Sequence, residues 1–120
     1  MRPDGWLVHS AGPRTSVGGA QVLATVEVAG TRAERRRGLL GREHIDGVLV
    51  LGVRSVHTVG MRSSIDVAHL DGDGTVLRVT TMRPNRVGRP VRGARRVVEA
   101  PAGAFARWGV LLGDRLEVRT

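Results

Sequence analysis

The sequence predicts a mainly β protein, either a sandwich or a barrel, with about eight short strands and two short helices. Short runs rich in valine, leucine and threonine recur along the chain, and glycine, aspartate or proline turn signals separate them. Aromatic residues make up only 2% of the chain, so valine, leucine and alanine must fill the interior. An α+β fold is the alternative.

In the first half of the chain, residues 5–9 are predicted to form a short strand that a loop follows. In residues 21–28, valine and alanine alternate with other residues, which is typical of a strand with one buried face. Thr31 with Glu34 three residues later is a capping box, and it predicts a short helix that ends at Gly41. The compact apolar run 48–53 predicts a strand covered on both faces.

The central stretch, residues 55–79, contains two of the four histidines and the clearest turn in the sequence. Residues 56–58 predict a short strand, and Gly60 allows a sharp bend after it. Residues 65–70 and 75–81 predict the two arms of a hairpin, because Asp-Gly-Asp-Gly separates them.

The last third begins with an arginine-rich segment, residues 82–96, that predicts an exposed loop with at most one irregular edge strand. Residues 95–100 predict a strand, after which Pro101 fits the first turn of a helix and Gly109 its end. Residues 115–119 predict the final strand. No internal repeat or linker is present, so the sequence predicts one domain over residues 1–120.

Composition excludes several classes of function. Cysteine is absent, which rules out disulfides, thiol catalysis and thiolate metal sites. The formal net charge is +8 and every basic residue is arginine, a balance that favours weak contact with anionic partners. No motif of a specific nucleic-acid reader is present. Without a signal peptide or an apolar membrane-spanning run, the sequence predicts a cytoplasmic protein and, we expect, a monomer.

Three segments in register resemble the domain of unknown function 192 family. They are TRAERRRGLLGRE at residues 31–43, VHTVGMRSSIDVAHLDGDGTVLRV at 56–79 and VVEAPAGAFARWGVLLGDRLEV at 97–118. The resemblance covers a core of about residues 21–118, preceded by an N-terminal strand and loop in residues 1–20. It implies a bacterial or archaeal β sandwich of jelly-roll type without an established activity.

The resemblance also implies a set of site residues. The central motif of the family falls on His57, Thr58, Gly60, Met61 and Asp66, and a later acidic position falls on Glu99. Many members have a Met-Lys-Asn run and aromatic residues near His57-Thr58, and many have proline where this chain has Ser64. Members often have secretion signals or lipid anchors that this sequence lacks.

Asp66 is the most informative single residue, because it interrupts the apolar run of a predicted strand. Its carboxylate could hold a loop by accepting backbone N–H bonds, or it could contact a ligand; a buried carboxylate needs a partner, for which Arg62 and His57 are candidates. His57 could act as a base or as a structural hydrogen-bonding residue. Glu99 could stabilise the amino end of the following helix, or share a pocket with Asp66.

Other chemistries have weaker support. His69 is expected to line the core or its rim, and His9 and His44 are isolated. Asp71-Gly-Asp-Gly only superficially resembles a calcium loop, since Met82 occupies the position of the bidentate glutamate. The histidines form no close ligand pair, and neither a P-loop nor G-x-G-x-x-G is present, so no metal and no cofactor are expected. Serines near His57 and Asp66 could serve as nucleophiles, but no G-x-S-x-G elbow exists.

Three hypotheses follow from these residues. The first is a binding or accessory module that takes a small ligand or partner peptide in a pocket around residues 57–66. The second is a hydrolase-like enzyme using His57 as base with Asp66 orienting it. The third is an adaptor to anionic surfaces or nucleic acid through exposed arginines. The ligand-binding candidates are His57, Thr58, Gly60, Met61, Arg62, Asp66 and Glu99; the anionic-surface candidates are Arg83, Arg86, Arg89, Arg92, Arg95 and Arg96.

Overall fold

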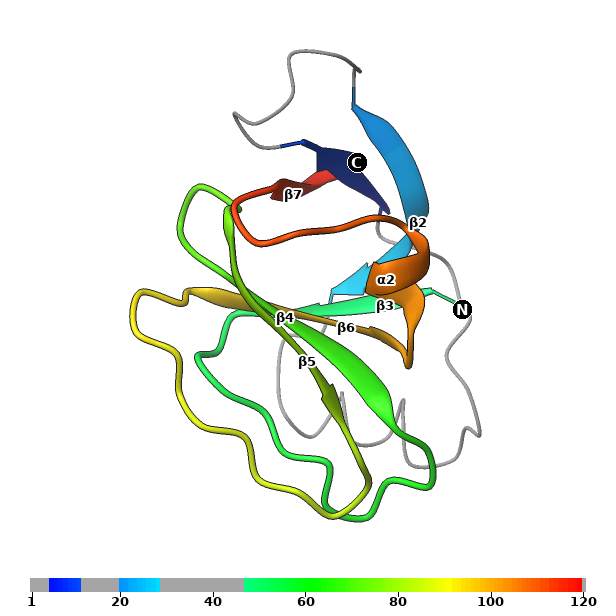
Figure 1. Cartoon of the computed structure of the whole chain (residues 1–120), viewed down its shortest axis with the longest axis vertical. Helices are drawn as coiled ribbons and strands as arrows, with labels where there is room; N and C mark the ends of the chain where they lie inside the picture. Colours follow the sequence, from blue (N-terminus) through cyan, green and yellow to red (C-terminus); the bar gives the residue numbers. More distant parts are fainter. Residues whose placement is uncertain (1–4, 12–19, 29–46, 120) are drawn as a thin grey trace.

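A computed structural model describes residues 5–11, 20–28 and 47–119 of the chain. This part contains seven strands and one short helix (Figure 1), which confirms the mainly β class. The elements are β1 (Gly5–Ser10), β2 (Gln21–Val28), β3 (Val48–Leu51), β4 (Ile65–Leu70), β5 (Val76–Met82), β6 (Arg96–Pro101), α2 (Ala104–Arg107) and β7 (Arg115–Arg119). The helix predicted over residues 31–41 lies outside the described residues, as does His44.

All seven strands belong to one mixed sheet with the order β5-β4-β6-β3-β2-β1-β7. Among the described strands, β2 and β3 pair in parallel and the other neighbours pair antiparallel. The sheet bends so far that its two end strands meet at a single bridge between Thr75 and Arg115. Among the described strands β5 and β7 do not pair along their lengths, so the sheet is not closed into a barrel.

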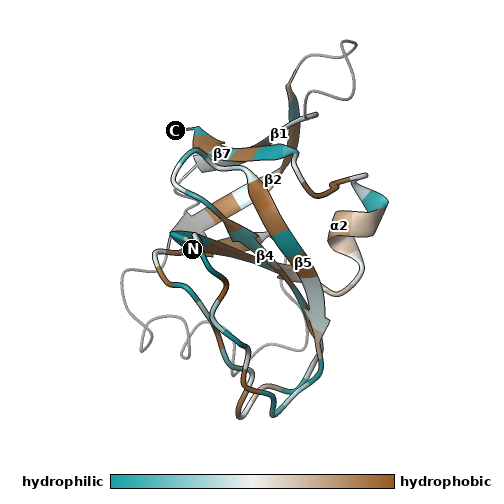
Figure 2. Cartoon of the chain, turned by 60° about the vertical axis from the view of Figure 1, so that its left-hand side comes forward, coloured by the Kyte–Doolittle hydropathy of each residue, from teal (hydrophilic) through white to brown (hydrophobic). Residues whose placement is uncertain are grey.

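Two apolar clusters cover the two faces of the central strands. The first contains alternate residues of β4 and β6, such as Ala68 and Val98, and it packs against Phe105 of α2. The second contains the intervening residues, such as Val67 and Val97, together with Val56 from the loop after β3. Figure 2 shows apolar residues along the strands and a mixture of polar and apolar residues in the loops at the lower end. β3 and β4 are buried throughout because both faces of the sheet are covered here.

The hairpin between β4 and β5 forms where the turn signal predicts it. The Asp71 carboxylate accepts hydrogen bonds from the backbone N–H groups of Asp73 and Thr75, at 2.8 and 2.9 Å. Gly74 has a φ of 85°, the left-handed conformation that glycine adopts without steric cost. The local chemistry of the turn therefore fixes the pairing of the two strands.

Two predicted elements differ from the structure. Residues 56–58 form only an isolated bridge, between His57 and Val87, because this segment pairs with a loop and not with the sheet. Pro101 is the last residue of β6 and not the first turn of a helix; Gly103, with a φ of 84°, redirects the chain before α2 begins at Ala104. No helix among the described residues is long and apolar enough to cross a lipid bilayer.

Candidate functional site

Asp66 is buried in β4 and ties the sheet to α2. The residue is 3% exposed. One carboxylate oxygen accepts a hydrogen bond from the Thr81 hydroxyl at 2.7 Å, and the other accepts the backbone N–H of Phe105 at 3.3 Å. The partners predicted for this carboxylate, Arg62 and His57, are not the ones in these hydrogen bonds. Asp66 therefore holds the first turn of the helix, the role that the sequence suggested for Glu99.

Glu99 lies on the other face of the sheet from Asp66. In the pairing of β4 with β6, Val67 is opposite Glu99 and Asp66 is opposite Ala100. Directly opposed residues share a face and successive residues alternate, so the two carboxylates point in opposite directions. The Glu99 side chain is fully buried, at 0% exposure. The sheet does not bring Asp66 and Glu99 into one pocket.

His57 belongs to a different part of the chain from Asp66 in β4. It lies half-buried in the loop between β3 and β4, whose residues Val56 and Met61 pack against the second apolar cluster. Asp66 faces the first cluster, across the sheet. The His57 Nδ1 accepts the backbone N–H of Val59 at 3.3 Å, a local turn contact. The hydrogen bonds of the Asp66 carboxylate described above come from Thr81 and Phe105 and not from His57.

Thr58, a residue of the family motif, forms hydrogen bonds through both its side chain and its backbone. It is 0% exposed. Its hydroxyl donates to the Arg83 carbonyl at 2.6 Å and accepts the Arg86 N–H at 2.9 Å. Its own N–H donates to the Arg86 carbonyl at 2.8 Å, and its carbonyl accepts the Asn85 N–H at 2.8 Å. Thr58 thus fastens the loop after β3 to the loop after β5.

The remaining motif residues support the same junction. Gly60 has a φ of 83° and donates its N–H to the Asn85 side-chain oxygen at 2.9 Å. Met61 donates its N–H to the Thr58 carbonyl and packs against the second apolar cluster. Arg62 is exposed. Through these contacts, the motif residues connect the loop after β3 to the loop after β5.

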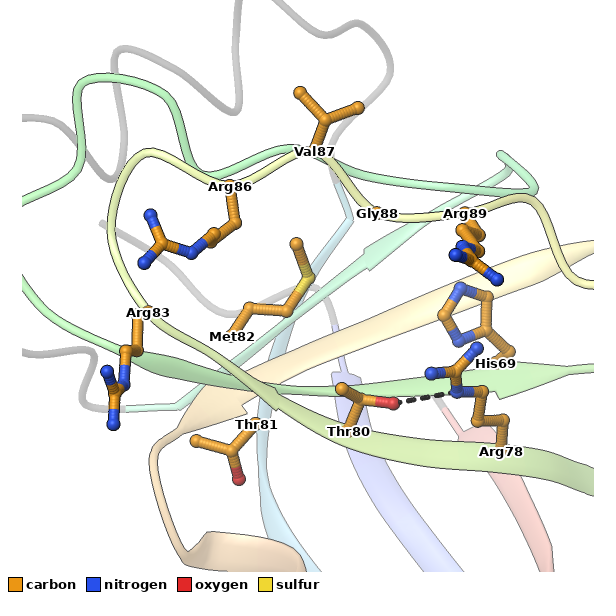
Figure 3. Close-up of a pocket in the computed structure, with 10 residues that line it drawn as sticks. All are labelled: His69, Arg78, Thr80, Thr81, Met82, Arg83, Arg86, Val87, Gly88 and Arg89. Carbon is orange, nitrogen blue, oxygen red and sulfur yellow. Dashed lines mark hydrogen bonds between the residues drawn. The ribbon is translucent and has the colours of Figure 1, made fainter.

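A cavity of about 470 Å³ lies next to this junction, between β4, β5 and the loop after β5. We call it the His69 cavity. Its lining residues are His69, Arg78, Thr80, Thr81, Met82, Arg83, Arg86, Val87, Gly88 and Arg89 (Figure 3). Four of the ten are arginines and none is acidic, so the cavity is cationic. Three of the six arginines predicted as an anionic surface line it; Arg92, Arg95 and Arg96 are exposed and are not among its lining residues.

His69 is a buried polar group on the cavity wall. The residue is 5% exposed, and neither ring nitrogen has a hydrogen-bond partner among the described residues. Figure 3 shows Arg78 and Arg89 on either side of its ring. Arg78 is opposite His69 in the pairing of β4 with β5, and its Nε donates to the Thr80 hydroxyl at 2.9 Å. Burial lowers the pKa of the His69 imidazole from its usual 6.5, and the nearby Arg78 charge lowers it further.

His9 and Asp114 form a buried polar pair. From the sequence alone, His9 is expected to be isolated. The His9 Nε2 lies 2.9 Å from an Asp114 carboxylate oxygen, with 9% and 1% of the two residues exposed. That oxygen also accepts the Leu111 N–H at 2.9 Å. The pair connects β1 to the turn before β7, so its contacts stabilise the fold.

The side chains that line the His69 cavity are donors of hydrogen bonds more than acceptors. Arginine guanidinium groups bind carboxylates and phosphates through several N–H donors, and a neutral imidazole adds one donor and one acceptor. Among the described residues, no group of three histidine, aspartate or glutamate side chains is placed to hold a metal ion. Sequence reasoning identified His69 as core-lining or a rim residue but not as part of a cavity. The signal available was the alternation that places His69, Arg78 and Thr80 on one face of the hairpin.

Comparisons with known proteins place this fold among uncharacterised relatives. The profile of the domain of unknown function 192 family, described as "Uncharacterized ACR", matches residues 14–118. A UPF0127 protein of Pyrococcus furiosus is 35% identical over 105 residues, which cover 82% of this chain and 90% of that protein. A UPF0127 protein of Pyrococcus abyssi is 41% identical over 63 residues, so the match spans only about half of each chain, 52% and 54%.

Two solved structures share the fold. A proposed transcription regulator from Sinorhizobium meliloti 1021 superposes with a TM-score of 0.76 at 25% identity and covers 98% of this chain and 96% of its own. A protein of unknown function from Novosphingobium aromaticivorans has a TM-score of 0.72 at 20% identity, with 93% and 83% covered. With the profile matching from residue 14 to residue 118, the chain belongs to the domain of unknown function 192 family.

Proposed function

We propose that this protein is a binding module that takes a small anionic ligand in the His69 cavity. The observation that carries the proposal is the combination of a buried imidazole lacking a hydrogen-bond partner among the described residues with a lining of four arginines. A buried polar group left without a hydrogen bond costs about 1–3 kcal/mol, and a ligand in the cavity would recover this cost. The volume of about 470 Å³ falls in the range of small-molecule sites.

The contacts of Thr58 support the proposal, because they fix the loop that supplies Arg83, Arg86 and Arg89. Two hydrogen bonds of its hydroxyl and two of its backbone hold the start of that loop. A loop that is already held loses less conformational entropy when a ligand binds. The family motif would then act on binding through the loop, without touching the ligand.

Calorimetric titration with citrate and with inorganic phosphate tests the proposal. We expect saturable binding by the natural protein, weakened by about tenfold or more in Arg89→Gln, because one charge-assisted contact is lost. Arg96→Gln is the matched control: Arg96 is exposed and precedes Val97 of the second cluster, so it faces the other side of the sheet. Absence of binding, or equal weakening by both substitutions, would reject the proposal.

A second candidate is nucleic-acid binding. Arg83, Arg86, Arg89, Arg92, Arg95 and Arg96 are all exposed within one short segment, and one protein of the same fold is described as a proposed transcription regulator. Titration with random-sequence duplex DNA at increasing salt tests this candidate. Binding of this kind would weaken steeply with salt and would be reduced by Arg92→Gln and Arg95→Gln, which should leave citrate binding intact.

A further inference from the structure

The hydrogen-bonding needs of His69 restrict the chemistry of the ligand. Both ring nitrogens are buried and neither has a hydrogen-bond partner among the described residues. A neutral imidazole presents one N–H donor and one bare acceptor nitrogen. Two different groups are therefore needed to satisfy the ring: one that accepts a hydrogen bond and one that donates one.

The two side chains that flank the ring do not supply an acceptor. Arg78 and Arg89, on either side of the ring in Figure 3, have only hydrogen-bond donors. Their positive charges attract an anion. A fully ionised carboxylate or phosphate could accept from the imidazole N–H and from both arginines. It has no proton for the bare nitrogen, which would stay buried without a hydrogen bond.

We infer that the ligand is a small hydroxy acid: its carboxylate or phosphate group lies between Arg78 and Arg89, and a hydroxyl beside that group bonds to the His69 imidazole. This inference rests on the proposed function, since it specifies the ligand of the same cavity. A hydroxyl is both donor and acceptor, so it can form a hydrogen bond with whichever ring nitrogen the anionic group does not contact.

Matched pairs of acids that differ by one hydroxyl test the inference. The carboxylate arm compares malate with succinate and citrate with tricarballylate; the phosphate arm compares glycerol phosphate with propyl phosphate. We expect the hydroxylated member to bind about five- to fiftyfold more tightly, because its absence leaves a buried nitrogen unsatisfied. The arm with the larger preference identifies the anionic group.

Two variants of His69 assign the preference to its ring. His69→Leu removes donor and acceptor together, so the hydroxyl preference should disappear while anion binding through the arginines remains. His69→Gln keeps one donor and one acceptor in a single amide, so it should retain part of the preference. Thermal melting of both variants identifies any that fails to fold, and the wild-type comparison does not depend on either.

The outcomes separate this inference from the proposed function. Equal affinity for both members of every pair overturns the inference and leaves an anion-binding module. A hydroxyl preference that His69→Leu fully retains also overturns it, because another group would then read the hydroxyl. If the natural protein binds none of the six acids, the proposed function and the inference both fail.

Discussion

At the scale of single residues, Asp66 links local chemistry to the fold. A carboxylate inside an all-buried strand is stable only where donors surround it. The Thr81 hydroxyl and the Phe105 N–H are such donors, one from the neighbouring strand and one from α2. The same side chain therefore stabilises a strand pair and positions the helix.

Replacing Asp66 with asparagine should lower the free energy of unfolding by about 1–3 kcal/mol. The amide NH₂ cannot accept a hydrogen bond, so one of the two donors loses its partner. Urea unfolding measures the loss, with Asp73→Asn in the exposed turn as the control. Citrate binding should change less than stability does, because Thr81 lines the His69 cavity but Asp66 itself does not; a large loss of binding with normal stability would place Asp66 in the ligand site.

His69 should make stability depend on pH. The folded state holds its pKa below the usual 6.5, with Arg78 and Arg89 flanking the ring and Glu99 on the same face of the sheet. As pH falls below about 6.5 the unfolded chain takes up a proton before the folded one, so this group's contribution to stability is present above that pH and is lost below it. Urea unfolding from about pH 7.5 to about pH 5 should show this fall in the natural protein and a smaller one in His69→Gln. Parallel pH profiles for the two proteins would contradict it.

The sequence reveals residue types but not their neighbours. The burial of His69 can be predicted from the sequence, because His69 lies two residues after the apolar Val67 and therefore on the same face of the strand. The pairing of His9 with Asp114 cannot be anticipated, because the two residues lie 105 positions apart in the sequence and only the sheet order brings them together. The separation of Asp66 from Glu99 has the same origin: which residue of β6 lies opposite which residue of β4 is a tertiary fact.

At the scale of elements, turn chemistry and alternation predicted most strands. The 71–74 turn and the alternation in β2 are local signals, so the sequence alone suffices for them. The 56–58 segment has strand-like composition but lies opposite a loop, and therefore forms one bridge only. The helix begins later than predicted because the Pro101 ring is accommodated at the end of a strand, where no further ladder N–H is required.

The junction of two loops at Thr58 is testable by hydrogen exchange. Thr58→Val keeps the shape of the side chain and removes the hydroxyl, so the Arg86 N–H loses its acceptor. We expect faster amide exchange at Arg86 and about 1–3 kcal/mol lower stability, since the site is buried. The Gly88 amide, which donates to the Val56 carbonyl, serves as an internal reference. Unchanged exchange at Arg86 would show that the hydroxyl does not hold this loop.

At the scale of the whole molecule, the two ends of the sheet meet where the β4–β5 turn contacts the start of β7. The Leu116 N–H donates to the Gly74 carbonyl at 2.9 Å, and the Val76 N–H donates to the Asp114 carbonyl at 2.8 Å. Buried polar residues lie beside this contact, since the Asp114 side chain also binds His9 of β1. We expect the bend of the sheet, and with it the orientation of the hairpin that carries His69, to depend on this contact.

Gly74→Ala should therefore destabilise the whole protein more than a turn substitution ordinarily does. A Cβ at Gly74 would collide with the Leu116 carbonyl oxygen, and the φ of 85° is unfavourable for alanine. The conformational cost alone is about 1–2 kcal/mol, and moving β7 away to relieve the collision adds to it. Gly72→Ala is the matched control, because its nearest neighbour is the flexible Arg95 side chain at 3.9 Å. Urea unfolding should show a clear loss for Gly74→Ala and little change for Gly72→Ala, with the Leu116 amide exchanging faster only in the former. Equal stability of the two variants would mean that the ends of the sheet are held together elsewhere.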